Sequence, residues 1–148
     1  PESVLNRTVA SHGLGGKGVT AVASKISAAD AFRKLSADYM DAAPVVSEAT
    51  NSIIGTFSVS ALRGILLVDI ETALSRNVEH FVMQKHTKPI SEQVCKANET
   101  LRDILKRLAK SGGHRLWIVD DDLHPIGVIT LTDLMRTFMK YFSGSRSK

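Results

Sequence analysis

A repeat at an offset of 73 residues is the feature that most limits how this 148-residue chain can fold. An apolar stripe with i, i+3, i+4, i+7 spacing covers residues 28–35 and returns over residues 101–108. This spacing places the apolar side chains on one face of a helix, so both segments are predicted to be amphipathic helices. At the same offset the apolar run at 43–46 meets 116–119, which predicts a short buried strand in each copy.

The repeat continues beyond these strands, with one residue fewer in the second copy. The sequence IIGTFSVSALRG at 53–64 matches PIGVITLTDLMR at 125–136. Each copy is therefore predicted to be a helix, a strand, a polar turn, a strand and a helix. Such a unit has a sheet face to cover and too little core to stand alone. We predict an α/β fold, of the α+β kind, in which the two copies pack with pseudo-two-fold symmetry.

The segments around the copies set the predicted domain boundaries. Residues 1–20 are predicted to be a flexible lead-in, 21–84 the first copy, 85–142 the second copy and 143–148 a disordered basic tail. An apolar stripe of helical period joins the copies and consists of Leu67, Ile70, Leu74, Val78 and Phe81. Because this stripe is more than one pair of repeats needs to bury, we expect a homodimer or a protein partner.

The last helix of the second copy is predicted to bury a similar stripe. Its members are Leu134, Phe138, Tyr141 and Phe142. This pattern is typical of a helix that packs on a core, so no cofactor role is assigned to it.

Composition places the chain among globular proteins, since 43% of its residues are hydrophobic. No apolar run approaches a membrane span and the N-terminus does not resemble a signal peptide, so a cytoplasmic or nuclear protein without membrane contact is expected. The single cysteine, Cys95, favours a reducing compartment and a packing role. The net charge of +4 is scattered among acidic residues, which disfavours nucleic-acid binding. A chain that begins at Pro1 is expected to be a fragment or a processed protein.

The stretch GLGGKG at 13–18 satisfies the G-x-G-x-x-G spacing of a dinucleotide-binding loop. That motif requires a helix directly after the glycines. Here the residues from Val19 to Val22 predict a strand, and Lys17 is not followed by the Ser or Thr of a phosphate-binding P-loop. We therefore predict a flexible turn outside any nucleotide site.

A hydroxyl and a carboxylate stand together where the last strand of the second copy is predicted to meet its last helix. Thr130 ends the strand, and Asp133 follows three residues later as the helix begins. The free N–H groups of a helix N-terminus and a hydroxyl suit a phosphate, whereas a carboxylate suits the paired hydroxyls of ribose. The pair is therefore a candidate nucleotide site. The alternative is that Thr130 and Asp133 only cap the helix.

The second copy resembles a known family. Residues 112–138 (GGHRLWIVDDDLHPIGVITLTDLMRTF) resemble the second half of a CBS domain, and residues 24–64 resemble a degenerate first copy. Together they resemble a tandem CBS pair, the Bateman module. The stretches HRLWIVD, GVITLTDL and FSVSALRG are similar to the gamma regulatory subunits of AMP-activated protein kinase and their plant and fungal relatives. A full gamma subunit has four such repeats, whereas this chain has two.

The resemblance implies a nucleotide site in the second copy. CBS modules hold their ligand with a G-x-x-[ST]-x-x-D motif, which here runs from Gly127 to Asp133. The resemblance implies ligand contacts at four residues of this stretch, namely Gly127, Ile129, Thr130 and Asp133.

The resemblance also implies that a His-Arg pair, His114 and Arg115, faces the phosphates. Arg supplies forked donors for phosphate oxygens, and His adds a donor whose charge depends on pH. The alternative is a basic surface turn. In the first copy only Ser58 keeps its hydroxyl, as a weak degenerate site, because Ala61 replaces the carboxylate and Asp41 replaces the histidine. We expect one competent site at most.

These patterns favour a regulatory module over an enzyme. The leading hypothesis is that AMP, ADP or ATP binds in the cleft between the repeats and modulates a partner protein, such as a kinase. The alternatives are a structural interaction module without a ligand, or binding of S-adenosylmethionine, which shares the ribose and adenine. No cofactor, metal site or catalytic set is predicted, because no His or Cys cluster has suitable spacing and Asp120–Asp122 predicts a solvated turn.

Overall fold

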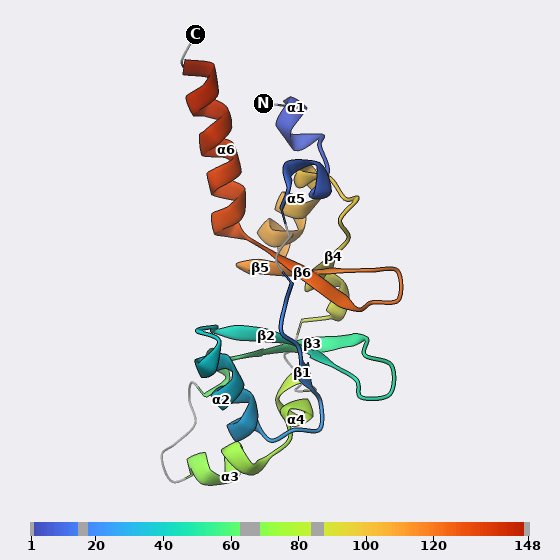
Figure 1. Cartoon of the computed structure of the whole chain (residues 1–148), viewed down its shortest axis with the longest axis vertical. Coiled ribbons are helices and arrows are strands. Elements are labelled where there is room, and N and C mark those ends of the chain that lie inside the picture. Colours follow the sequence, from blue (N-terminus) through green and yellow to red (C-terminus); the bar gives the residue numbers. More distant parts are fainter. Residues whose placement is uncertain (1, 15–17, 63–68, 84–87, 147–148) are drawn as a thin grey trace. The chain divides into compact units, whose positions relative to one another are not determined.

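The computed structural model of this chain describes residues 2–14, 18–62, 69–83 and 88–146. They divide into two compact units, each with a three-stranded sheet and its own helices (Figure 1). We call Val19–Ile90 with Leu123–Pro125 the first-repeat unit, and the rest of the chain the second-repeat unit. Two small mixed sheets with separate helices confirm the predicted α+β fold.

The first-repeat unit contains a sheet with strand order β1-β2-β3. Strand β1 is parallel to β2, and β2 is antiparallel to β3, with Ala42 opposite Ser58 and a register shift between Val45 and Val46. The elements of this unit are β1 (Val22–Ala23), α2 (Ala28–Ala37), β2 (Ala42–Val46), β3 (Ile53–Ser58), the 3-10 helix η2 (Val59–Leu62), α3 (Ile70–Ser75) and α4 (Val78–Val82).

The second-repeat unit repeats this arrangement with strand order β4-β5-β6, and β4 is parallel to β5. A short helix and a 3-10 turn from the N-terminal residues belong to the same unit. The remaining elements in chain order are α1 (Glu2–Leu5), η1 (Ala10–His12), η4 (Ile90–Glu92), β4 (Val94–Cys95), α5 (Leu101–Ser111), β5 (Arg115–Val119), β6 (Pro125–Thr130) and α6 (Leu131–Arg146).

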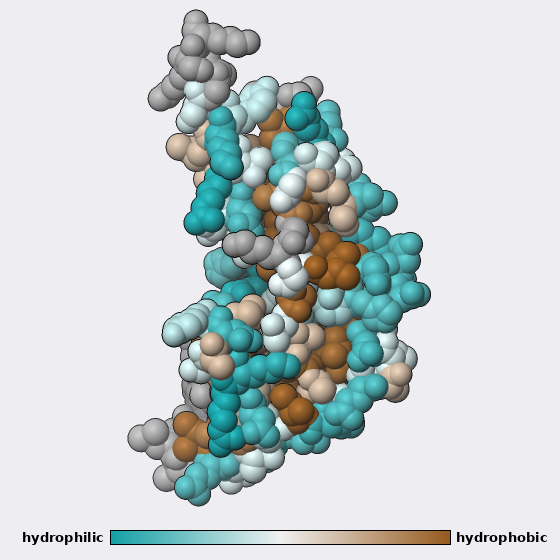
Figure 2. Space-filling view, viewed as in Figure 1, coloured by the Kyte–Doolittle hydropathy of each residue, from teal (hydrophilic) through white to brown (hydrophobic). Residues whose placement is uncertain are grey.

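Each unit is built around the apolar faces that the repeat predicted. In α2, Ala28 and Ala31 are fully buried, and in α5 Leu101 and Ile104 are fully buried. Figure 2 shows apolar side chains, drawn in brown, in both units among hydrophilic ones. The two cores are separate sets of residues, one containing Val22, Leu35, Val45, Phe57 and Val78, the other Val9, Leu108, Leu116, Ile129 and Leu134. The amphipathic helices and buried strands are therefore confirmed.

The predicted flexible lead-in is wrong for the described residues 2–14. Val4 and Val9 are buried in the core of the second-repeat unit. The backbone N–H of Val9 donates to Glu99 O at 3.0 Å, and that of Leu101 donates to Arg7 O at 3.0 Å. These bonds tie the start of the chain to the N-terminus of α5, where unpaired backbone groups need partners.

The same backbone pattern occurs in the first-repeat unit. Val78 N–H donates to Ile26 O at 2.9 Å, and Ala28 N–H donates to Arg76 O at 2.8 Å. Each repeat is thus completed by the segment that precedes the other repeat in the sequence. The segment around Arg7 stands 69 residues before its counterpart around Arg76, so the offset of 73 did not reveal the equivalence.

The predicted helix between the copies is interrupted. Helix α3 ends at Ser75 and α4 begins at Val78, because Arg76 is extended (φ −75°, ψ 153°) and pairs with the segment before α2. Val78 is buried as predicted, whereas Ile70, Leu74 and Phe81 are half-buried. Val82, which is not part of the predicted stripe, is also buried. Leu67 lies outside the described residues.

Helix α6 differs from the prediction at its C-terminal end. The predicted disordered tail is wrong for residues 143–146, which continue the helix to Arg146, whereas 147–148 lie outside the described residues. Leu134 is fully buried, but Tyr141 and Phe142 are exposed, so the predicted buried stripe covers only the first half of the helix. Neither α6 nor any other helix in the described part of the chain has the length and apolar character needed to cross a membrane.

Candidate functional site

The candidate site lies where β6 ends and α6 begins. The backbone N–H of Thr130 donates to Asp133 Oδ2 at 3.0 Å, and the N–H of Asp133 donates to Thr130 Oγ1 at 3.1 Å. This reciprocal pair is a capping box, which satisfies two backbone donors at the helix N-terminus. The structure therefore confirms that Thr130 and Asp133 lie side by side, and it shows that they cap α6.

The hydroxyl half of this motif is repeated at two other helices. Ser27 Oγ accepts from Asp30 N–H at 3.1 Å before α2, and Thr100 Oγ1 accepts from Asp103 N–H at 3.3 Å before α5. At α2 the carboxylate of Asp30 pairs with Arg33 instead of returning to the cap. The S/T-x-x-D spacing by itself thus predicts a helix start and not a ligand.

Capping does not use all the polar atoms of the pair. The Thr130 hydroxyl accepts one hydrogen bond and still has its own O–H to donate, and Asp133 has a second carboxylate oxygen, Oδ1. Both side chains are half-buried, so part of each reaches solvent. Capping and ligand binding are therefore compatible at the same residues.

The His-Arg pair lies beside this junction. The backbone N–H of Leu131 donates to the carbonyl of His114 at 2.9 Å, which ties the residue before β5 to the first residue of α6. His114 is exposed and Arg115, the first residue of β5, is half-buried. The tertiary structure thus brings together two motifs that stand about fifteen residues apart in the sequence.

The predicted site residues on strand β6 lie on different faces of the strand. Gly127 and Ile129 are buried, and the side chain of Ile129 belongs to the core of the second-repeat unit. Val128 and Thr130 alternate with them and are half-buried. The side chain of Ile129 therefore packs in the core, and the predicted ligand contact at Ile129 stays a prediction. Val128 is the apolar neighbour on the face of Thr130. The period-2 rule applied to β6 could have found it.

The first repeat shows the same backbone with different side chains. Val59 N–H donates to Asp41 O at 2.9 Å, which is the counterpart of the bond between Leu131 and His114. Ser58 Oγ lies 2.5 Å from Ser60 Oγ, and Ala61 packs against the core. An acidic residue thus occupies the histidine position and no carboxylate occupies the Asp133 position, as the sequence predicted.

Comparison with known proteins identifies this architecture. Residues 78–140 match the model of the CBS domain family. The CBS domain of a membrane protein from Sphaerobacter thermophilus has a TM-score of 0.72 and 16% identity, covering 92% of this chain and 90% of that one. This chain has the fold of a CBS domain pair.

Two other solved CBS proteins of the same fold contain adenosine derivatives. CBSX2 in complex with AMP has a TM-score of 0.67 and 22% identity, covering 91% of this chain and 98% of that one. The CBS domain pair of protein MJ0100, in complex with 5′-methylthioadenosine and S-adenosyl-L-methionine, has a TM-score of 0.67 and 17% identity. The match covers 90% of this chain and 97% of that one.

Curated relatives of the CBS domain pair carry kinase-subunit names. The SNF1-related protein kinase regulatory subunit gamma-like PV42a of Arabidopsis thaliana is 23% identical over 156 residues, which cover 96% of this chain and 44% of the relative. The 5′-AMP-activated protein kinase subunit gamma-3 of Sus scrofa is 29% identical over 100 residues, which cover 68% of this chain and 19% of the relative. The resemblance to gamma subunits is therefore confirmed, and this chain spans less than half the length of these relatives.

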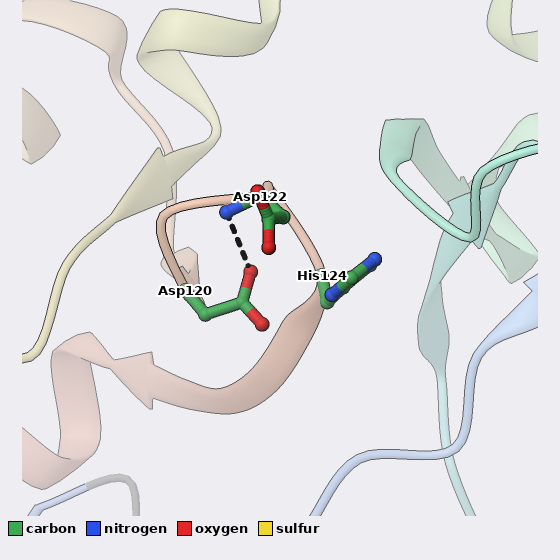
Figure 3. A group of neighbouring side chains, drawn as sticks. All are labelled: Asp120, Asp122 and His124. Carbon is green, nitrogen blue, oxygen red and sulfur yellow. Dashed lines mark hydrogen bonds between the residues drawn. The ribbon is translucent and has the colours of Figure 1, made fainter.

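A second polar group of this CBS pair lies on the loop between β5 and β6 (Figure 3). Asp120, Asp122 and His124 each place one potential ligand atom within 4.8 Å of the others. Asp122 N–H donates to Asp120 Oδ1 at 3.0 Å, and His124 Nε2 lies 3.1 Å from Thr50 O. These bonds shape the turn. Asp121 and Asp122 are exposed, in agreement with the predicted solvated turn.

The single cysteine is a packing residue in the second-repeat unit. Cys95 is 2% exposed. Burial raises the pKa of its thiol to about 12, and the nearby Glu99 carboxylate adds to the increase. The thiol is therefore protonated at neutral pH, which is unfavourable for a nucleophile.

The glycine-rich stretch is only partly described. Gly13 has a φ of 68° and ends the 3-10 helix η1, a conformation that glycine adopts without strain. Residues 15–17 lie outside the described residues, so the predicted absence of a nucleotide loop at 13–18 stays a prediction.

Proposed function

We propose that this chain is a regulatory module that binds an adenine nucleotide beside the β6–α6 junction and modulates a partner protein, such as a protein kinase. The hydrogen bond from Leu131 N–H to His114 O carries the proposal, because it joins the cationic pair to the Thr130–Asp133 cap. Hydrogen-bond donors for a phosphate and an acceptor for the ribose hydroxyls then lie in one unit. AMP in CBSX2 and the gamma-subunit names of the relatives support this choice of ligand and partner.

Each side chain has a distinct role in this proposal. The Thr130 hydroxyl and the N-terminus of α6 bind a phosphate oxygen, since the dipole of a 16-residue helix favours an anion there. Asp133 Oδ1 accepts from the ribose hydroxyls. Arg115 donates to the phosphates, and His114 adds a second donor through a ring N–H.

A structural module without a ligand is the second candidate. The capping box satisfies Thr130 and Asp133 without a ligand, and the first repeat lacks the carboxylate. S-adenosylmethionine is an alternative ligand, because it presents ribose and adenine, and it occurs in the MJ0100 structure. The pair His114 and Arg115 favours a phosphate-bearing ligand instead.

The test must separate capping from binding, because Asp133→Ala removes both. Asp133→Ala is expected to lower the free energy of unfolding by about 0.5–2 kcal/mol. It should also weaken AMP binding about 10- to 100-fold, because a charged acceptor is lost. Asp133→Asn keeps an oxygen for the Thr130 N–H, so its stability should stay near wild type while AMP still binds more weakly.

The matched control is Thr100→Ala at the start of α5, where the Thr100 hydroxyl caps a helix away from His114 by accepting from Asp103 N–H. This variant should lose stability without any change in AMP affinity. Titration calorimetry with AMP, ADP, ATP, adenosine and S-adenosylmethionine, with a thermal melt of each variant, measures both quantities. Equal AMP affinity in wild type, Asp133→Asn and Asp133→Ala, or no binding of any of the five, would support the structural module.

A second variant tests the phosphate contact. Arg115→Ala should weaken the binding of ATP and ADP more than the binding of adenosine, because only the phosphates contact the guanidinium. The difference should shrink as salt rises, since exposed charges are screened. An equal loss for adenosine and ATP would contradict a phosphate contact.

A further inference from the structure

The loops that follow α2 and α5 hold equivalent positions in the two repeats, but they close in different ways. After α2, Met40 N–H donates directly to Leu35 O at 2.8 Å, five residues back. At the offset of 73 residues, their counterparts after α5 are Gly113 and Leu108. The Leu108 carbonyl accepts instead from Gly112 N–H at 2.9 Å, four residues on. Helices commonly end in one or the other of these two patterns.

A serine side chain takes the place of the direct bond after α5. The backbone N–H of Gly113 donates to Ser111 Oγ at 3.2 Å, and the Ser111 hydroxyl donates to Leu108 O at 3.4 Å. A hydroxyl can accept and donate at the same time, so it bridges the two backbone groups. Ser111 and Gly113 are both half-buried. The bridge therefore holds Gly113 N–H away from the helix carbonyl that its counterpart in the first repeat contacts.

The bridged loop leads directly into the cationic pair of the candidate site. Gly113 is followed by His114, whose carbonyl accepts from Leu131 N–H at 2.9 Å at the start of α6. Arg115 then begins β5, so the sheet fixes its backbone. The stretch from Ser111 to His114 is thus anchored to α5 by the serine hydroxyl and to α6 by the His114 carbonyl. A change at Ser111 alters the path of the backbone between these two anchors.

We propose that Ser111 is a positioning residue that holds the turn before His114 and Arg115 in the form that presents this pair to the ligand phosphates. Without the hydroxyl, the N–H of Gly113 donates directly to the Leu108 carbonyl, as its counterpart does in the first repeat. The turn then tightens and draws His114 toward the end of α5. The identity of the ligand rests on the proposed function, whereas the effect of Ser111 on the backbone does not.

The alternative is that Ser111 contributes only to the stability of α5. The first repeat distinguishes the two roles, because its direct bond from Met40 satisfies the Leu35 carbonyl without a side chain. The same closure is open to the second repeat through Gly113, so loss of the hydroxyl leaves neither backbone group without a partner. We therefore expect a change in the affinity for phosphates with little change in stability.

Ligand titration of the full chain tests the proposal. Ser111→Ala should weaken the binding of AMP, ADP and ATP about three- to tenfold, which is the loss expected when a hydrogen-bond donor is misplaced. The affinity for adenosine should stay within about twofold of wild type, because adenosine has no phosphate. The midpoint of a thermal melt should stay near that of wild type. Ser111→Thr keeps the hydroxyl and should restore the preference for AMP over adenosine.

The matched control is Ser75→Ala at the end of α3. There the Ser75 hydroxyl donates to Thr72 O at 2.7 Å, three residues back, which is the same bond that Ser111 makes to Leu108. This variant should keep the wild-type preference for AMP over adenosine. An equal loss for AMP and adenosine in Ser111→Ala, an unchanged preference in that variant, or no rescue by Ser111→Thr would overturn the positioning role.

A measurement without ligand separates this proposal from the proposed function. In amide nitrogen–proton NMR spectra, Ser111→Ala should shift the resonances of Arg115 and Leu131, because both depend on the path of His114. The amide resonances of the first-repeat unit should stay in place. If these shifts occur but the wild-type chain binds no nucleotide, the proposed function fails and the role of Ser111 in placing the His-Arg pair stands. Unchanged resonances of Arg115 and Leu131 would overturn that role, even if AMP binds.

Discussion

At the scale of single residues, the ends of two equivalent helices differ in an informative way. Tyr39 follows α2 with a φ of 53°, and Gly112 follows α5 with a φ of 67°. Near these residues the carbonyl of Leu35 accepts from Met40 N–H at 2.8 Å, and the equivalent carbonyl of Leu108 accepts from Gly112 N–H at 2.9 Å. Glycine adopts this left-handed conformation freely, whereas a residue with a Cβ does so at a cost.

Tyr39→Gly is therefore expected to stabilise the protein by about 1 kcal/mol, because it removes the left-handed strain. The side chain of Tyr39 is 98% exposed, so little packing is lost. Gly112→Ala should destabilise by about the same amount for the opposite reason. Urea unfolding of the two variants measures both changes, and a Tyr39→Gly protein less stable than wild type would show that the tyrosine ring contributes packing.

At the scale of elements, an ion pair holds β4 against α5. Arg107 Nη1 donates to Val94 O at 2.8 Å, and Arg107 Nη2 donates to Glu99 Oε1 at 2.5 Å. Burial raises the pKa of the Glu99 carboxyl, but the hydrogen bonds from Arg107 and from the Lys96 N–H outweigh burial. The net pKa of Glu99 lies below its ordinary value of 4.5. The pair is three-quarters buried, so it is shielded from most of the solvent screening.

Glu99→Gln should lower the free energy of unfolding by about 1–3 kcal/mol at pH 7, because Arg107 loses a charged partner. A lowered pKa means that the stabilisation is present above the unfolded-state pKa and is lost as pH falls through the folded-state pKa. The difference between Glu99→Gln and wild type should therefore shrink below about pH 4.5. Chemical denaturation at pH 7 and at low pH tests this. Glu71→Gln, at an exposed position on α3, should show no such difference.

At the scale of the whole molecule, each repeat depends on residues that precede the other one. Val9 and Val78 are both fully buried, each beside the helix start of the repeat that it completes. Their backbone bonds are equivalent, since Ala10 N–H donates to Ala97 O at 3.0 Å and Glu79 N–H donates to Ser24 O at 3.0 Å. The second repeat is therefore completed by residues from the start of the chain, and the first repeat by the segment that lies between the two repeats.

Val9→Ala and Val78→Ala should each cost about 1–3 kcal/mol of unfolding free energy, through lost burial and the cavity left behind. Hydrogen exchange should reveal a crossed pattern. Val9→Ala should speed exchange in α5 and β5 of the second repeat, and Val78→Ala should speed exchange in α2 and β2 of the first. Faster exchange in the first repeat after Val9→Ala, or in the second repeat after Val78→Ala, would contradict this arrangement.

The amino-acid sequence by itself determined the elements and the candidate pair. Apolar spacing fixed α2 and α5, since residues three and four apart share a helix face wherever the helix is placed. The same local rule placed Thr130 at the end of a strand and Asp133 in the first turn of a helix. The first repeat's missing carboxylate at Ala61 could also be read directly from the repeat.

Only the tertiary structure decided what these elements contact. Residues 2–14 look like a polar lead-in because Val4 and Val9 have no local period, and their burial depends on a partner segment about ninety residues away. The bond from Leu131 to His114 likewise joins distant motifs, and the core takes Ile129 while leaving Val128 beside Thr130. Local periodicity sets which face of an element is apolar, but the choice of what covers that face depends on non-local packing.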